Sequence, residues 1–182
     1  IQNLIKCVQR AGVEIDDLVL EPLASSEAVL TEAEKEMGVV LVDIGGGTTD
    51  IAVFIEGSIW HTVVLPVGGS NITNDIAIVL RLPYDQAEEL KVRYGSAQPL
   101  LVDEASTIQT PAFDRRERLV ISQRDLSEVV EARIAEIFGL VLAEIKRSGY
   151  DGLLPAGVVV TGGTAQLPGI KEVAEHIIGL PV

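Results

Sequence analysis

The chain has 182 residues, a formal net charge of −13 and a hydrophobic content of 47%. Its length suits one ordinary domain or two small ones, and its composition can supply a sizeable core. The negative charge disfavours nucleic acid and anionic membranes as direct partners of this segment. The single cysteine, Cys7, excludes an internal disulfide framework and fits a reducing cytoplasm.

The first part of the chain predicts two helices on either side of a short strand. Apolar spacing and breaker residues predict a helix over residues 1–11, a strand over 18–20 and a helix over 24–36. No apolar run is long enough to cross a membrane, and no secretory signal is visible. Because the chain begins without a methionine and inside a helical pattern, we expect a fragment of a longer protein.

Three apolar runs then predict consecutive antiparallel strands over residues 39–42, 51–55 and 59–65. The runs are rich in β-branched residues and bounded by turn signals, as buried strands are. The sequence DIGGGTTD joins the first two runs and places three glycines between two aspartates. A plain hairpin with a flexible turn is the simplest interpretation, but so many glycines between acids favour a ligand site.

The residue types in this turn suit a phosphate and its metal ion. Without Cβ atoms, residues 45–47 can take positive φ and approach a ligand, and successive N–H groups in such a turn bind anions. Thr48 and Thr49 add hydroxyl donors. Asp43 lies between apolar residues, where a carboxylate needs a partner, and Mg²⁺ commonly binds through one carboxylate plus phosphates and water. This combination suggests a nucleotide.

Two familiar phosphate loops do not fit DIGGGTTD. A Walker A loop requires GxxxxGK[ST], and this turn contains no lysine. A dinucleotide fingerprint would have a third glycine where Asp50 stands, and it would open a helix instead of a strand. The turn therefore indicates a phosphate loop of another kind.

Two glycine pairs follow predicted strands elsewhere in the chain. Gly68-Gly69 ends the third strand, and Asn71 or Thr73 can cap the helix that follows. Near the end of the chain, a valine-rich strand leads into Gly162-Gly163 and a helix that Pro168 begins. Tight packing of a strand against a helix explains either pair when it is taken alone.

The segment over residues 84–94 predicts a helix with paired charges. Asp85 and Glu88 are spaced as a capping box, and Glu88 and Lys91 lie three residues apart on one face. The stripe expected to be buried consists of Ala87, Leu90 and Tyr94.

A hairpin and a long helix are predicted between the two glycine pairs. Residues 102–113 and 119–122 read as strands, joined by a charged turn over 114–118 near which an acidic peptide could dock. An apolar repeat of about 3.6 residues predicts a helix over 125–147, which Gly149 ends.

The motifs together resemble a known superfamily. DIGGGTTD on a strand–turn–strand resembles the second phosphate loop of the actin/Hsp70/sugar-kinase superfamily, and VGGSNITNDIA with AEELKVRYG resembles the FtsA family of bacterial cell-division proteins. The resemblance covers nearly the whole chain and implies an α/β fold, the second domain of an actin-like (ribonuclease H-like) ATPase with an inserted α+β subdomain. It assigns residues 1–36 to the tail of the first domain and its linking helix, 37–69 and 153–182 to the core of the second domain, and 70–152 to the inserted subdomain.

The resemblance also implies site residues. Asp43 would hold Mg²⁺ through water, and Glu21 in EPLASSEAV would orient the water that attacks the γ-phosphate, unless it is simply an exposed glutamate at a strand end. Arg133 would face the tail of FtsZ, unless its stem only covers apolar surface. For Glu88 and Lys91 the alternative is a cap plus a surface ion pair. The residues implied to hold ATP are Gly45, Gly46, Gly47, Thr48, Gly68, Gly69, Glu88, Lys91, Gly162 and Gly163.

The whole protein implied is an ATP-binding, actin-like adaptor with slow or no ATP hydrolysis. It would polymerise head to tail and link FtsZ filaments to the inner face of the cytoplasmic membrane at the division site, through a C-terminal helix outside this sequence. Two other classes stay open. One is a related scaffold, either a PilM-type pilus-assembly protein or a rod-shape filament, and the other is a phosphotransferase of the sugar-kinase branch.

Overall fold

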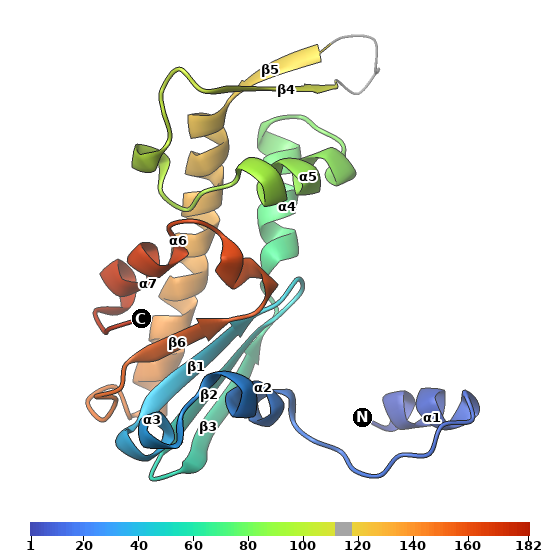
Figure 1. Cartoon of the computed structure of the whole chain (residues 1–182), viewed down its shortest axis with the longest axis vertical. Coiled ribbons are helices and arrows are strands. Elements are labelled where there is room, and N and C mark those ends of the chain that lie inside the picture. Colours follow the sequence, from blue (N-terminus) through green and yellow to red (C-terminus); the bar gives the residue numbers. More distant parts are fainter. Residues whose placement is uncertain (112–117) are drawn as a thin grey trace.

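The computed structural model describes residues 1–111 and 118–182 (Figure 1). Its centre is a four-stranded sheet in the order β3-β2-β1-β6. Its strands are β1 (Val39–Ile44), β2 (Thr49–Ile55), β3 (Ser58–Leu65) and β6 (Val158–Thr161). The first three strands are consecutive and antiparallel, as predicted, whereas β6 lies parallel to β1. The turn between β1 and β2 and the C-terminal end of β6 therefore lie at the same end of the sheet.

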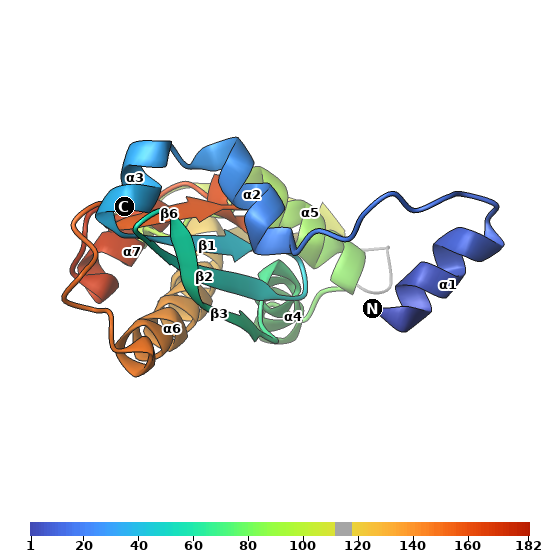
Figure 2. The ribbon, with the colours of Figure 1, turned by 90° about the horizontal axis from the view of Figure 1, so that it is seen from below.

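Alternating side chains of β1 fill a core on each face of the sheet. Val40 and Val42 belong to the larger core, which the helices α4 (Gly69–Val79), α6 (Gln123–Ser148) and α7 (Ile170–Ile178) complete. Val39 and Leu41 belong to the smaller core on the other face, beneath the segment that forms α2 (Glu21–Val29) and α3 (Glu32–Met37). Figure 2 shows α2 and α3 on one side of the sheet and α4 and α6 on the other. Burial on both faces explains the unbroken apolar run of β1.

Helix α6 connects the sheet to a hairpin at the opposite end of the molecule (Figure 1). Ser122 caps its first turn, and Gly149 ends it in a left-handed conformation, as predicted. The hairpin consists of β4 (Thr107–Pro111), which lies within its predicted segment, and β5 (Arg118–Ser122), which begins one residue earlier than predicted. Most of the charged turn predicted over 114–118 lies outside the described residues. The predicted stripe of α6 is buried at Leu126, Val130, Ile134, Ile137, Phe138, Val141 and Ile145.

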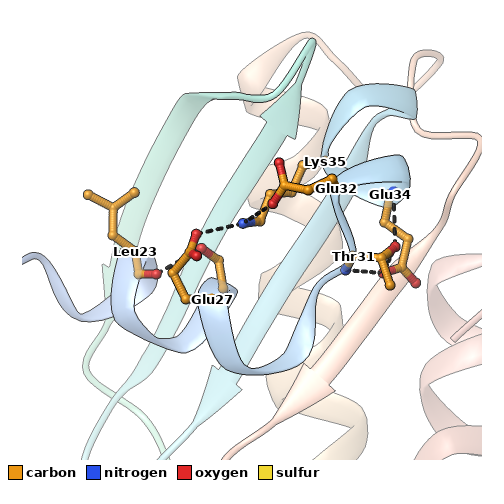
Figure 3. A network of polar contacts seen from close by, with 7 residues as sticks. Leu23, Glu27, Thr31, Glu32, Glu34 and Lys35 are labelled. Carbon is orange, nitrogen blue, oxygen red and sulfur yellow. Dashed lines mark hydrogen bonds and ion pairs between the residues drawn. The ribbon is translucent and has the colours of Figure 1, made fainter.

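The helix predicted over residues 24–36 is wrong, because the chain forms two helices, α2 and α3. Thr31 interrupts the pattern and starts α3 with a capping box: its hydroxyl accepts from the N–H of Glu34, and the Glu34 carboxylate accepts from the N–H of Thr31 at 2.7 Å. The buried Lys35 then joins the helices, since its ammonium group lies 2.6 Å from Glu27 of α2 and 3.0 Å from Glu32 of α3 (Figure 3).

The short strand predicted over residues 18–20 does not form. This segment is exposed coil between α2 and the outlying helix α1 (Gln2–Arg10), none of whose residues is buried. A β-strand needs a neighbour for its backbone hydrogen bonds, and no strand of the described residues lies beside this segment. Among the described helices, none is both long and apolar enough to cross a membrane.

Three predicted helix starts are also wrong. Helix α4 begins at Gly69, so neither Asn71 nor Thr73 is its cap, although the side chain of Asn71 accepts from the N–H of Gly68 at 2.9 Å. Helix α7 begins two residues after Pro168, because Gly169 intervenes at a left-handed φ of 80°. The third case is α5 (Tyr84–Tyr94), where no capping box forms and the end of the predicted stripe, Tyr94, is exposed.

Candidate functional site

Three glycine segments that are far apart in the sequence converge at one end of the sheet. The carbonyl oxygen of Gly45 accepts from the N–H of Gly69 at 2.9 Å and from the hydroxyl of Thr164 at 3.1 Å. The carbonyl of Gly46 accepts from the N–H of Ser70 at 2.7 Å. The first turn of α4 and the short helix η2 (Gly163–Gln166) therefore both fix the β1–β2 turn through its carbonyl oxygens.

The same turn leaves consecutive backbone donors free. The N–H of Gly45 closes the turn by donating to the carbonyl of Thr48 at 2.9 Å. Within the described part of the chain, the N–H groups of Gly46, Gly47 and Thr48 make no hydrogen bond, and all three residues are exposed. Successive free amides of this kind bind anions. The positive φ that these glycines allow is not used, since none of residues 45–47 adopts it.

The glycines divide into those that the fold requires and those that it does not. A Cβ on Gly68 or Gly69 would lie 2.6–2.8 Å from neighbouring atoms, and one on Gly162 would lie 2.5 Å from the carbonyl oxygen of Ile44. At Gly47 and Gly163, by contrast, a Cβ would meet nothing within 4 Å. Packing thus explains Gly68, Gly69 and Gly162, whereas the space beside Gly47 and Gly163 is open to a ligand.

A cavity of about 450 Å³ opens where these segments meet. Its volume lies within the range of small-molecule sites. The cavity is lined by Gly45, Gly46, Gly69, Ser70, Tyr84, Glu88, Lys91, Val92, Gly163, Thr164, Gln166, Leu167 and Pro168. Six of the ten residues predicted to hold ATP therefore line this cavity. The other four, Gly47, Thr48, Gly68 and Gly162, lie within two positions of a lining residue in the chain.

Asp43 lies at the end of β1, beside the glycine turn. One carboxylate oxygen accepts from the hydroxyl of Ser25 at 2.8 Å. The strand register puts Asp50 on β2 and Thr161 on β6 directly opposite Asp43, so all three side chains share one face of the sheet. Asp43 is only partly buried, and its other oxygen lies 2.5 Å from where a Cβ of Gly162 would stand, so the carboxylate packs closely against this glycine. An accessible carboxylate beside free amides can accept a hydrated cation.

Glu21 is the first residue of α2 and is exposed. Ser25 lies one helical turn further along and contacts Asp43, and residues four apart on a helix are neighbours on one face, about 5–6 Å apart. Glu21 is therefore one turn away from the Asp43 contact, on the face of α2 that bears Ser25. The prediction that Glu21 lies at the end of a strand is therefore wrong, because it begins a helix.

The two threonines of the turn already have hydrogen-bond partners. The hydroxyl of Thr48 donates to Asp50 at 3.1 Å, and the buried hydroxyl of Thr49 donates to the carbonyl of Val67 at 2.8 Å. The expectation that Thr49 adds a free donor is therefore wrong, because its side chain fixes β2 to the segment before α4. The exposed Thr48 still has its backbone N–H available.

Lys91 of α5 connects the cavity wall to α4. Its ammonium group lies 2.7 Å from the carboxylate of Glu88, 2.9 Å from the hydroxyl of Thr73 and 3.1 Å from the carbonyl of Gly69. An ammonium group has three donors, and these three acceptors use them all. The side chain of Lys91 is only 11% exposed, so this is not the simple surface pair that was the alternative interpretation.

Glu88 forms the outer part of the same network. Its carboxylate contacts Thr73 as well as Lys91, which is why it does not cap α5. Burial alone would raise the pKa of Glu88, but the hydrogen bonds from Lys91 and Thr73 outweigh burial and lower it. A charged carboxylate, 42% exposed at the cavity wall, is available to accept hydrogen bonds from hydroxyl groups of a ligand.

Arg133 lies away from this cavity and binds within the chain. Its guanidinium group forms two hydrogen bonds with Asp75 of α4, at 2.6 and 2.9 Å, and a third with Glu136 at 2.7 Å. The bidentate pair connects α6 to α4, the helix whose first turn holds the glycine turn.

Four polar residues of the site were not predicted. Each acts through a contact between segments that are distant in the sequence, as when Thr164 reaches Gly45 across 119 positions. Only Ser25 could have been found from the sequence, because it lies one helical turn after the predicted site residue Glu21. The four residues are Ser25, Ser70, Thr73 and Thr164.

Solved structures show the class of fold to which this arrangement belongs. MreB5 of Spiroplasma citri bound to ADP has a TM-score of 0.78 and 23% identity, over 99% of this chain and 58% of that one. Ethanolamine utilization protein EutJ from Carboxydothermus hydrogenoformans has a TM-score of 0.69 and 32% identity, over 96% of this chain and 52% of that one. The fold is that of the actin-like ATPases, as predicted.

The sequence then gives the family. The family model for cell division protein FtsA matches residues 40–182. Cell division protein FtsA of Pseudomonas aeruginosa is 54% identical over 181 residues, which are 100% of this chain and 43% of that protein, and FtsA of Escherichia coli K12 is 40% identical over 97% of this chain and 44% of that protein. The chain belongs to the FtsA family of cell division proteins and spans less than half the length of these relatives.

Proposed function

We propose that this chain forms one side of an ATP site in an actin-like cell-division protein. The observation that carries the proposal is the row of free amides at Gly46, Gly47 and Thr48, beside a cavity on which three glycine segments converge. These amides would bind the β- and γ-phosphates of ATP, and the open space beside Gly163 would take the nucleoside. Solved structures of MreB5 with ADP and with AMPPNP share the fold and support a nucleotide here.

The proposal gives each of four charged residues of the site one task. Asp43 would hold Mg²⁺ through water, since its carboxylate is accessible and lies next to the amides. Glu21 would orient the attacking water, and slow or absent hydrolysis would suit a protein whose nucleotide controls assembly. Glu88 would bind the ribose, and Lys91 would act mainly by positioning Glu88 and Gly69, because its donors are used within the chain.

The domain division is part of the proposal. Residues 37–69 and 153–182 contain the sheet and form the domain core, 70–152 form an inserted subdomain, and 1–36 belong to the first domain and its linking helix. The unburied helix α1 is consistent with this assignment, since its apolar side would pack on a first domain. ATP would then lie in the cleft between the two large domains of the full-length protein.

Asp43→Asn is expected to weaken Mg-ATP binding by about tenfold. The amide keeps the shape of the carboxylate and can still accept from Ser25, so the loss reports on charge at the metal. Calorimetric titration of the full-length protein with ATP, in magnesium and in EDTA, is the measurement, and the loss should appear only in magnesium. Asp151→Asn removes one charge from an exposed loop and is the matched control. Undiminished Mg-ATP binding by Asp43→Asn contradicts the metal assignment.

The family also supports a role in bacterial division. The full-length protein would polymerise and would connect FtsZ filaments to the inner face of the cytoplasmic membrane at the septum. Arg133 is the proposed contact for the FtsZ tail, and a carboxylate of that tail would have to share the guanidinium group with Asp75.

Because Asp75 and the FtsZ tail would compete for Arg133, substitutions at Arg133 and at Asp75 should change tail binding in opposite directions. Arg133→Glu is expected to weaken binding of an FtsZ tail peptide by about tenfold, whereas Asp75→Asn, which frees the guanidinium group, should strengthen it by a few fold. Fluorescence anisotropy with a labelled tail peptide measures both. If Asp75→Asn weakens binding as much as Arg133→Glu, the ion pair is structural and the tail binds elsewhere.

A further inference from the structure

A second cavity lies on the side of the molecule formed by α6, α7 and the short helix η1 (Pro99–Leu101). We call it the η1–α6–α7 groove. Its volume of about 650 Å³ exceeds that of the glycine-lined cavity, with which it shares no lining residue. Neither Arg133 nor its partner Asp75 lines it.

The lining of the groove is mostly apolar and includes two strongly exposed leucines. Leu100 and Leu101 are 86% and 72% exposed, which is unusual for two adjacent leucines. On the opposite wall, α7 contributes Ile177. Between the walls, α6 presents Ala132 and Ala135, whose small side chains allow another backbone to approach closely. This shape and lining suit a helix that carries one apolar stripe.

The rim of the groove is acidic. Glu128 and Glu131 on α6 and Glu172 on α7 line it, and no lysine or arginine of the described residues does. Within the same part of the chain, none of the three carboxylates forms an ion pair. The chain as a whole carries a net charge of −13, so an acidic partner would be repelled and a basic one attracted.

We propose that the η1–α6–α7 groove binds a cationic amphipathic helix of a partner protein. The apolar stripe of this helix would cover Leu100 and Leu101, and lysine or arginine side chains on its flanks would reach Glu131 and Glu172. The charges favour this occupant over a second copy of the acidic chain, and they would speed association while making it dependent on salt. The site is independent of the proposed ATP site, because the two have no residue in common.

A synthetic peptide tests this proposal with the full-length protein. The probe is a fluorescein-labelled helical peptide with leucine at every third or fourth position and lysine on the flanks, and its binding is followed by anisotropy at low and high salt. We expect saturable binding that weakens with salt. The double substitution Glu131→Lys with Glu172→Lys should weaken it about tenfold or more, and Leu100→Ser with Leu101→Ser should do the same without changing charge.

Matched controls separate the groove from general attraction to an acidic protein. Glu56→Lys with Asp151→Lys reverses two exposed charges elsewhere and should leave binding within twofold. Equal losses for the two charge-reversed proteins, or unchanged binding after the leucine substitutions, would overturn the proposal. So would absence of binding by the full-length protein, which would mean that its own chain or a second copy covers the groove. ATP titration of the groove variants should match the unsubstituted protein, which keeps the two proposals distinguishable.

Discussion

Gly162→Ala is expected to lower the free energy of unfolding by about 3–4 kcal/mol. Gly162 has a φ of 91° and a ψ of 173°, a region that is almost confined to glycine and costs an L-residue about 1–3 kcal/mol. The added Cβ would also stand 2.5 Å from the backbone oxygen of Ile44 and from the carboxylate of Asp43, and relief of such overlap typically costs about 1–3 kcal/mol. Because Ile44 belongs to the buried β1, the backbone cannot move aside cheaply. Urea denaturation measures the loss.

The neighbouring glycine is the control for this prediction. A Cβ on Gly163 meets nothing within 4 Å, and its φ is not left-handed, so Gly163→Ala should change stability by less than about 1 kcal/mol. If the backbone at Gly163 lies against the nucleoside, as we propose, the same substitution should still weaken ATP binding. Equal stability of the two alanine variants would contradict the structural argument, whereas unchanged ATP binding by Gly163→Ala would count only against the proposed nucleoside contact.

The sequence predicted what depends on local chemistry. β-branched runs and turn residues were enough for β1, β2 and β3, and an apolar repeat with a terminal glycine was enough for α6. The resemblance of DIGGGTTD to a phosphate loop led to the actin-like fold, which the solved structures confirm. Each of these features can be read from residues within one element.

Features that depend on distant contacts were missed or wrong. Residues 18–20 have strand-like side chains but no strand beside them in the described chain, so tertiary context decided their state. Glu88 has the spacing of a capping residue, but Lys91 and Thr73 hold its carboxylate. Arg133 has the position of an exposed side chain, but Asp75, 58 residues earlier, pairs with it. Spacing along one element cannot show a competing partner on another.

Helix α4 explains why these separate contacts matter to the site. Its first turn donates to the carbonyls of Gly45 and Gly46, and Thr73 connects its second turn to Lys91 of α5. Asp75, half a turn further on, is held by Arg133 of α6. The position of the glycine turn is thus fixed by a helix that is anchored to two others, and Lys91 is the anchor closest to the cavity.

Lys91→Met is expected to destabilise the protein by about 2–3 kcal/mol and to weaken ATP binding. Methionine fills a similar volume but leaves the carbonyl of Gly69, the hydroxyl of Thr73 and the carboxylate of Glu88 without the ammonium group that they share. Removing one partner of a fully buried ion pair costs about 3–5 kcal/mol, and the loss here is smaller because Glu88 is 42% exposed. Lys171→Met, at an exposed pair with a separation of 3.7 Å, should cost less than about 0.5 kcal/mol.

The pH dependence of stability distinguishes this network from simple packing. Hydrogen bonds from Lys91 and Thr73 lower the pKa of Glu88 below its ordinary value of 4.5, so its contribution to stability is fully present above pH 4.5. That contribution is lost as the pH falls below 4.5 and the carboxylate takes up a proton in the folded state. The difference in unfolding free energy between the unsubstituted protein and Lys91→Met should therefore be largest near pH 7 and should shrink below pH 4.5. A difference that is constant from pH 7 to pH 3 would mean that Lys91 acts through packing alone, and the argument that it holds Glu88 at the cavity wall would fail.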